Sequence, residues 1–193
     1  MTTSSLSPTP REQLRDLIVE LAVVRGRVTL SSGREADYYV DLRRVTLHHE
    51  AAPLVGEVLL DLLDAQVPGG LGAVDAVGGL TMGADPVAAA LLHAAAARGR
   101  ALDAFVVRKE AKAHGLQRRI EGPDVVGRRV VAVEDTSTTG GSVLTAVDAL
   151  VEAGAHVVAV AVILDRGTGA AERVAERGLP YLSAFSKDDL GLA

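Results

Sequence analysis

From residue 73 onward, short apolar runs alternate with stretches of helical periodicity, and this alternation restricts the fold more than any other feature of the sequence. The runs are apolar at successive positions, which is typical of parallel strands buried on both faces. The order therefore predicts an α/β fold in which helices flank a central, mostly parallel sheet. The expected strands are 73–77, 102–107, 130–133, 157–164 and 179–185, and the expected helices between them are 86–97 and 142–153.

The segment before residue 73 predicts a small helix–hairpin unit over about residues 11–45. Apolar residues recur there at helical spacing, and turn residues such as Gly33 separate two short runs of strand type. The expected elements are a helix over 11–24, two strands over 28–30 and 38–42, and a second helix over 49–65.

Residues 1–10 are polar and include two prolines, so they are expected to form a disordered tail. They lack the charged start and apolar stretch of a signal peptide. The chain has 193 residues, which is enough for one buried core but short for two. Residues 11–193 are therefore expected to form a single domain.

Charge and cysteine content narrow the functional classes. The formal net charge of −5 argues against a nucleic-acid surface, but residues 108–122 alone carry +3, which leaves −8 for the remainder. A local cationic segment on an acidic protein favours a small polyanionic ligand. The chain contains no cysteine, so thiolate chemistry, disulfides and cysteine zinc sites are excluded. No apolar run is long enough to span a bilayer, and we expect a cytoplasmic protein with no membrane or nucleic-acid partner.

One stretch, VVAVEDTSTTGGS at residues 130–142, indicates what that ligand is. Ligands of doubly wound sheets bind beyond the carboxyl ends of the strands, which is where Glu134 and Asp135 are expected. Gly140 and Gly141 allow successive backbone N–H groups to converge at the start of the next helix and bind an anion. The two acids can accept hydrogen bonds from vicinal hydroxyls or bind Mg²⁺. A phosphate beside a diol describes a ribose 5-phosphate.

A plainer interpretation treats Glu134 and Asp135 as solvated strand-end residues and the glycines as an ordinary turn. The lysine that a Walker A loop requires is missing, since Val143 follows Ser142. The GxGxxG and HExxH motifs are absent as well, which weakens the dinucleotide, nucleoside-triphosphate and zinc-peptidase interpretations.

The motifs together resemble a known family. VVAVEDTSTTGGS resembles the phosphoribosyl-pyrophosphate (PRPP) signature of type I phosphoribosyltransferases. RKEAKAHG (108–115) is similar to the catalytic loop of the orotate phosphoribosyltransferases within that family, TLSSGREADYY (29–39) to their N-terminal hairpin, and GGLTMGADP (78–86) to their pyrophosphate loop. The resemblance implies a type I phosphoribosyltransferase-like fold with a small N-terminal hood. It also implies transfer of the phosphoribosyl group from PRPP to orotate, giving orotidine 5′-monophosphate and pyrophosphate.

The resemblance assigns roles to individual residues. Glu134 and Asp135 would hold the ribose hydroxyls. Thr138 and Arg166 match positions that contact orotate, and an arginine fork suits a carboxylate. The 5-phosphate would be bound by Thr136, Ser137, Thr138, Thr139, Gly140, Gly141 and Ser142.

The leaving pyrophosphate would be bound and stabilised by Arg108, Lys109, Lys112 and His114. Displacement through an oxocarbenium-like transition state requires cations on the departing polyanion, and Mg²⁺ brought mainly by PRPP would add to them. The resemblance further implies a homodimer in which the 108–122 loop is shared across the interface. The backbone near Tyr39 and the N–H groups of 79–83 would also face the ligand.

Two positions depart from the family pattern, because some orotate enzymes carry lysine where this chain has Ser31 and Gly83. The alternatives are a type I phosphoribosyltransferase for another base, a non-catalytic PRPP-binding regulator, and a plain α/β scaffold. Each feature also has a plainer interpretation of its own: the basic residues of 108–122 form only a solvated face, and Arg166 merely pairs with Asp165 or another acid.

Overall fold

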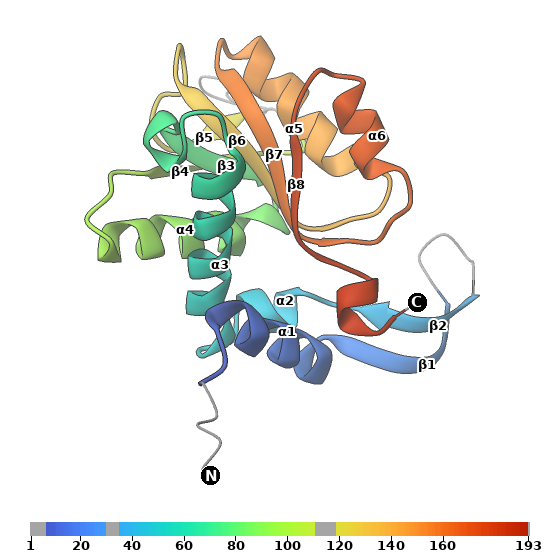
Figure 1. The fold of residues 1–193 in the computed structure, drawn as a ribbon. Helices are drawn as coiled ribbons and strands as arrows, with labels where there is room; N and C mark the ends of the chain where they lie inside the picture. Colours follow the sequence, from blue (N-terminus) through green and yellow to red (C-terminus); the bar gives the residue numbers. More distant parts are fainter. Residues whose placement is uncertain (1–6, 30–34, 111–118, 193) are drawn as a thin grey trace.

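The computed structural model describes residues 7–29, 35–110 and 119–192 (Figure 1). Its centre is a six-stranded sheet with the strand order β5-β4-β3-β6-β7-β8. All neighbouring strands are parallel except the edge strand β5, which is antiparallel to β4. The mostly parallel α/β sheet expected from the sequence is therefore confirmed. The strands are β3 (Ala76–Leu80), β4 (Asp103–Val107), β5 (Ile120–Glu121), β6 (Arg129–Ser137), β7 (His156–Asp165) and β8 (Tyr181–Ser186).

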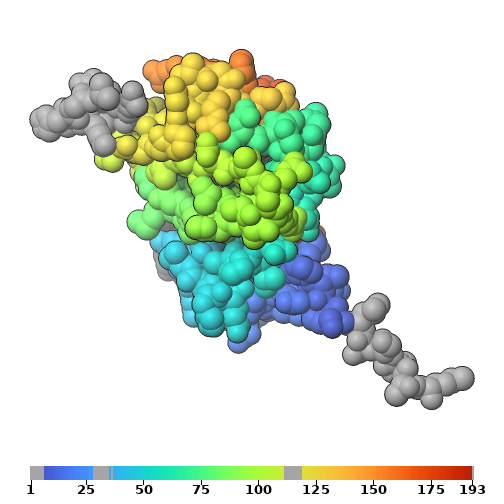
Figure 2. All heavy atoms as spheres, turned by 90° about the vertical axis from the view of Figure 1, so that its left-hand side faces the viewer, coloured from blue at the N-terminus to red at the C-terminus, as the bar shows by residue number. Residues whose placement is uncertain are grey.

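Helices cover both faces of this sheet (Figure 1). Side chains of β6 alternate between the two cores: Val131 and Val133 pack with the α3 and α4 side, and Val130 and Ala132 pack with the α5 side. Both faces of the strand are apolar because both are covered. The helices are α3 (Ala51–Gln66), α4 (Ala84–Ala97), α5 (Gly141–Glu152) and α6 (Ala170–Ala175). Figure 2 shows α3 and α4 forming one side of the molecule.

The N-terminal elements form a separate layer, which we call the hood: α1 (Pro10–Leu21), β1 (Val23–Thr29), β2 (Glu35–Val40) and α2 (Arg43–Thr46). The strands β1 and β2 pair in an antiparallel two-stranded sheet, as expected. The C-terminal 3-10 helix η2 (Asp188–Leu190) lies beside the hood (Figure 1). Arg11 of α1 donates a hydrogen bond to the carbonyl of Ala184 (2.9 Å), so both ends of the chain hold the hood against the sheet.

The first helix is shorter than predicted. α1 ends at Leu21, whereas the sequence predicted a helix to residue 24, because Val23 and Val24 pair with β2 instead. These β-branched residues favour a strand. At the other end, Thr9 caps the helix and Pro10 is its first residue, so the last part of the predicted 1–10 tail belongs to the start of α1. Residues 1–6 lie outside the described residues.

The strand boundaries near the cleft also differ from the prediction. The predicted strand 73–77 is replaced by β3 at 76–80, preceded by a 3-10 turn, η1 (Leu71–Ala73). Gly78 and Gly79 lie in this strand. Both positions require glycine, because a Cβ atom at either would overlap a backbone oxygen of the adjacent strand. β5, α2 and α6 were not predicted, because elements this short show no periodicity. Within the described residues, no helix is long and apolar enough to cross a membrane.

Candidate active site

The two adjacent acids lie at the carboxyl end of β6. Glu134 is only 7% exposed, and Asp135 is largely buried beside it. The backbone N–H of Thr136 donates to Oδ1 of Asp135 (2.6 Å), and the N–H of Asp135 donates to Oε1 of Glu134 (3.3 Å). Both carboxylates lie against the backbone of Gly83, so they are close to each other at the strand end. The acids are not solvated strand-end residues, which removes the plainer interpretation of this stretch.

The burial of this pair changes its protonation. Burial raises the pKa of Glu134 to about 8, and repulsion from the Asp135 carboxylate adds to the increase. Burial also raises the pKa of Asp135 from its ordinary value, which is opposed by the hydrogen bond from Thr136 and by the charge of Arg43. Two neighbouring buried carboxyl groups do not both ionise easily without a partner. The pair is therefore prepared for a ligand that supplies hydroxyl donors or a cation.

The segment after the acids forms a tight turn at the start of a helix, a geometry suited to an anion. β6 continues through Ser137, and α5 begins at Gly141 after Gly140, whose φ of 76° is left-handed. The first N–H groups of a helix have no partners within it, and the helix dipole favours negative charge at that end. Arg173 of α6 fixes the turn from outside by donating to the carbonyl of Thr139 (2.7 Å).

Arg166 enters the site from the neighbouring strand. It directly follows β7, and its backbone N–H donates to the carbonyl of Ser137 (3.0 Å). Its guanidinium carbon lies 5.7 Å from the centre of the Tyr38 ring in the hood. Asp165 accepts from the N–H of Gly167 (3.0 Å). Arg166 thus connects the end of the sheet with the hood and leaves its charge facing the cleft.

These elements enclose a cleft of about 440 Å³ between the hood and the carboxyl end of the sheet. Of the site residues predicted from the sequence, the cleft is lined by Lys109, Glu134, Asp135, Thr136, Thr138, Ser142 and Arg166. The convergence of strand ends and a helix N-terminus matches the ligand position of doubly wound folds.

Among the described residues, the other predicted site residues do not line this cleft. Ser137 is buried at 3% exposure, and Arg108 forms an ion pair with Glu121 (3.7 Å between Nη1 and Oε1). Thr139, Gly140 and Gly141 shape the turn behind the cleft. Lys112, His114 and Ser31 lie outside the described residues.

Sequence reasoning missed the contribution of the hood beyond Tyr39. Asp41 and Arg43 line the cleft and bind each other, with Nε of Arg43 2.8 Å from Oδ1 and Nη2 3.1 Å from Oδ2 of Asp41. The available signal was a charged pair placed directly after the apolar hairpin strand. The charges face the end of β6, about ninety residues away in sequence, and no local pattern encodes that proximity.

The loop after β3 closes the opposite wall of the cleft. Thr81, Met82 and Gly83 line it, and the peptide bond between Thr81 and Met82 is cis. A Cβ atom at Gly83 would overlap Oε1 of Glu134 and lie 3.0 Å from Oδ1 of Asp135. The glycine is therefore required for close packing of this loop against the acids. Gly79, expected in this loop, lies within β3.

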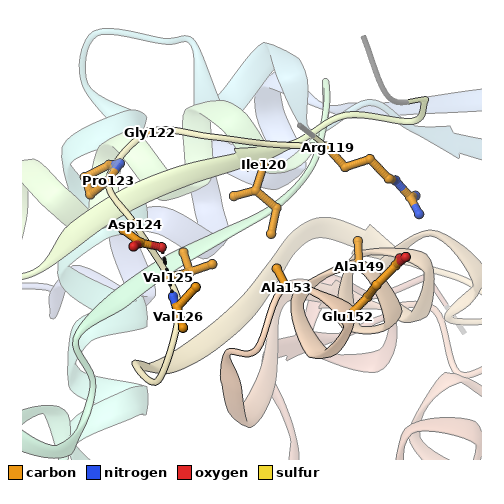
Figure 3. Close-up of a pocket in the computed structure, with 10 residues that line it drawn as sticks. All are labelled: Arg119, Ile120, Gly122, Pro123, Asp124, Val125, Val126, Ala149, Glu152 and Ala153. Carbon is orange, nitrogen blue, oxygen red and sulfur yellow. Dashed lines mark hydrogen bonds between the residues drawn. The ribbon is translucent and has the colours of Figure 1, made fainter. Parts of the chain in front are cut away.

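A second cavity, of about 460 Å³, lies under the edge strand β5 (Figure 3). Ile120, Val125, Ala149 and Ala153 form its apolar walls, and Glu152 lies at its rim. It is bordered by the last turns of α5, whereas the turn after the acids lies at the first. It lacks the paired buried acids and the helix N-terminus of the cleft, so we do not assign the chemistry to it.

The chain is similar to known phosphoribosyltransferases. Residues 64–177 match the family model described as the phosphoribosyl transferase domain. The orotate phosphoribosyltransferase of Streptomyces coelicolor is 70% identical over 184 residues, 94% of this chain and 97% of that protein. The orotate phosphoribosyltransferase of Corynebacterium glutamicum is 56% identical over 192 residues, covering 100% of both chains.

Solved structures show the same likeness. The crystal structure of Mycobacterium tuberculosis orotate phosphoribosyltransferase in complex with PRPP has a TM-score of 0.81 and 52% identity, covering 95% of this chain and 100% of that chain. The same enzyme in complex with Fe(III) dicitrate has a TM-score of 0.84 and 57% identity, with coverage of 95% and 100%. These matches confirm the expected fold class.

Proposed function

The chain belongs to the orotate phosphoribosyltransferase family, and we propose that the cleft between its hood and its sheet is where the reaction takes place. The reaction transfers the 5-phosphoribosyl group of PRPP to orotate and releases pyrophosphate, forming orotidine 5′-monophosphate for pyrimidine synthesis. The observation that carries the proposal is the buried pair Glu134 and Asp135 directly before the turn at the start of α5. That arrangement suits a ribose 5-phosphate, because a diol donates to acids and a phosphate accepts from N–H groups.

Glu134 and Asp135 would bind the ribose 2- and 3-hydroxyls. Burial raises the pKa of both carboxyl groups, so their charged forms gain from the hydroxyl donors of a bound ribose. The turn residues Thr136 to Ser142 would bind the 5-phosphate through backbone N–H groups and hydroxyls. A ligand held at both ends has its C1 carbon fixed in front of the hood, where the second substrate enters.

Orotate would lie beneath the hood, with its carboxylate toward Arg166 and its ring edge near Thr138. The guanidinium fork of Arg166 is suited to a planar carboxylate, and the cleft supplies both residues on its lining. A neutral purine base would leave this cation without a partner. This favours orotate over another base, as does the identity to orotate enzymes.

The departing pyrophosphate would be stabilised by Lys109 in the cleft and by Arg108, Lys112 and His114. Charge develops on the leaving group as the bond to C1 breaks, so fixed cations there lower the barrier. His114 could hold a proton for the pyrophosphate oxygen. Lys112 and His114 lie outside the described residues, and their part rests on the RKEAKAHG resemblance.

The site also fits Mg²⁺ carried by the substrate. Among the described residues, no cluster of three or more His, Asp or Glu side chains can hold a metal ion by itself. The two buried carboxylates of Glu134 and Asp135 are nevertheless hard oxygen donors that gain from a nearby cation. Mg²⁺ bound mainly by PRPP oxygens would neutralise charge on the departing pyrophosphate.

We also propose a homodimer in which residues 108–122 of one copy reach the site of the other. Two large apolar side chains, Leu47 and Met82, are 75% and 69% exposed, which is consistent with a surface that a second copy covers. A single domain over 11–193 and a cytoplasmic location remain part of this proposal. The absence of cysteine is consistent with a reducing compartment.

The test is loss of the ultraviolet absorbance of orotate in the presence of protein, PRPP and Mg²⁺. Orotate consumption should require every component and fall at least about hundredfold in Asp135→Asn and in Lys112→Ala. Asp188→Asn, an exposed acid of η2, is the matched control and should keep full activity.

If calorimetry shows PRPP binding but no orotate is consumed, the chain is a phosphoribosyltransferase for another base or a non-catalytic PRPP-binding regulator. Absence of both PRPP binding and turnover would refute the assignment of the acid pair.

A further inference from the structure

Among the described residues that line the cleft, Arg43 is the cation to which the proposed function gives no role. It is the first residue of α2, and its Nε and Nη2 bind the two carboxylate oxygens of Asp41 at 2.8 and 3.1 Å. Oδ1 of Asp41 also accepts from the backbone N–H of Arg43 (3.2 Å). The side chain and the backbone N–H of Arg43 are thus both held by Asp41. The Arg43 side chain remains 51% exposed, and the Nη1 donors of its guanidinium point away from this fork.

The charge balance of the cleft gives Arg43 a consequence for ligand binding. Among the described residues, the charged side chains that line it are three acids and three cations, namely Asp41, Glu134, Asp135, Arg43, Lys109 and Arg166. Because burial raises the pKa of Glu134 to about 8, that carboxyl is mostly protonated at neutral pH, and the described lining then has an excess of one positive charge. Without Arg43 this excess is lost, and with it the attraction for a polyanionic substrate.

The position of Arg43 relative to the acids indicates which substrate group it meets. Arg43 opposes the rise in the pKa of Asp135 that burial causes, so its charge lies on the Asp135 side of the cleft. With the ribose on the acids and its 5-phosphate at the turn after β6, the C1 substituent extends away from that turn. The hood residues 41–43 and the loop residues 81–83 line the cleft outside that turn.

The loop 81–83 cannot supply a cation at Gly83, its point of contact with the acids. Gly83 packs so tightly against Glu134 that a Cβ atom would overlap Oε1, so this position offers only backbone. Lys109 is the other described cation lining the cleft apart from Arg166, to which orotate is assigned. Besides Lys109, Arg43 is therefore the described cation of the cleft lining that is available to the leaving group, which carries the largest charge of the substrate.

We propose that Arg43 is a substrate-binding residue that holds the pyrophosphate group of PRPP through its free Nη1 edge, with Asp41 fixing the guanidinium in the required orientation. This inference rests on the proposed function, since it uses the ribose position assigned there. A guanidinium already bound to a carboxylate loses little side-chain freedom when a second anion arrives, which favours tight binding.

The competing explanation is that Arg43 and Asp41 form a structural ion pair that only stabilises the hood. The two explanations differ in what a substitution changes. A structural pair affects the unfolding temperature and leaves substrate affinity unchanged. A pyrophosphate ligand affects the KM for PRPP far more than the KM for orotate.

The experiment compares Arg43→Gln and Arg43→Lys with Arg44→Gln, an exposed arginine of the same helix that does not line the cleft. Steady-state KM values are measured for PRPP and for orotate, and binding of inorganic pyrophosphate with Mg²⁺ is measured by calorimetry. Arg43→Gln should raise the KM for PRPP and the Kd for pyrophosphate by about tenfold to hundredfold, the usual effect of losing a charged hydrogen bond. Arg43→Lys should recover part of the loss, and Arg44→Gln should match the wild type.

Three outcomes would overturn the proposal. One is a lower unfolding temperature in Arg43→Gln with an unchanged KM for PRPP. Another is a raised KM for orotate alone, which would assign Arg43 to the carboxylate. The third is an equal loss of PRPP and pyrophosphate affinity in Arg44→Gln, which would show that the effect comes from the net charge of the protein and not from a contact of Arg43. If the wild type binds pyrophosphate in an Arg43-dependent manner but consumes no orotate, the proposed function fails and the assignment of Arg43 stands.

Discussion

Replacing Glu134 by glutamine should stabilise the empty protein while impairing it as an enzyme. Glu134 is buried at 7% exposure next to Asp135, and both burial and the neighbouring carboxylate disfavour its charged form. Glutamine has nearly the same shape and cannot ionise. The substitution therefore removes the cost of a buried charge but also removes one acceptor for the ribose hydroxyls.

The magnitude follows from the pKa of Glu134, which rises from 4.5 to about 8 on folding. A carboxyl whose folded pKa is raised contributes stability that is fully present below the unfolded pKa and lost as pH rises to the folded one. The gap, 8 minus 4.5, is 3.5 pH units, and at about 1.4 kcal/mol per unit the full loss approaches about 5 kcal/mol. At pH 7 about 3 kcal/mol of it has been lost. The gain in Glu134→Gln should thus be near zero at pH 4 and grow steadily up to pH 8.

The assay is urea unfolding of wild type and Glu134→Gln without ligands at several pH values between 4 and 9, followed by circular dichroism. The free energies of unfolding should converge at acidic pH and diverge above pH 5. Glu20→Gln, at an exposed position of α1, is the matched control and should follow the wild type at every pH. A Glu134→Gln stability difference that does not vary between pH 5 and pH 9 would refute the reasoning.

Three further substitutions test other contacts. Gly83→Ala should abolish activity and destabilise by about 1–3 kcal/mol, because its Cβ would overlap Oε1 of Glu134; normal turnover and stability by calorimetry would contradict this. Gly140→Ala should lower the free energy of unfolding by about 1–2 kcal/mol and weaken PRPP binding, because φ is 76° at this position. The control Gly99→Ala, at φ 66° far from the cleft, should lower the free energy of unfolding by a similar amount without changing PRPP binding. Arg11→Ala should lower the free energy of unfolding by about 1 kcal/mol, because it removes the bond to Ala184, and an unchanged midpoint in urea would argue against that contact.

The repeating part of the fold was predictable from the sequence because its signals are local. The strands at 102–107 and 157–164 are apolar at successive positions, and the structure has strands over nearly the same residues. The predicted position of β3 was three residues too early, because Gly78 and Gly79 are typical loop residues. Glycine is needed there because the adjacent strands pack too closely for a Cβ atom, which the local sequence does not reveal. The two-residue strand β5 was missed because its only cause is pairing with β4.

The candidate site divides in the same way. Glu134, Asp135 and the turn after them are contiguous in sequence, so their chemistry could be read as one motif. Arg166 was identified only through the resemblance, and its position beside Tyr38 depends on tertiary structure. Asp41 and Arg43 were missed because their relation to Asp135 arises when the hood meets the sheet.

The way the chain closes on itself has a consequence for its synthesis. Leu190 and Leu192, at the C-terminal end, are buried in the same core cluster as Leu14 and Ile18 of α1. The residues of α1 leave the ribosome long before part of the surface they pack on has been made. At roughly 5–20 residues per second, the hood waits roughly ten to thirty seconds for its final contacts. During that interval the nascent chain exposes an apolar helix face, and the cleft, one wall of which is the hood, is completed only after Leu190 and Leu192 have been made.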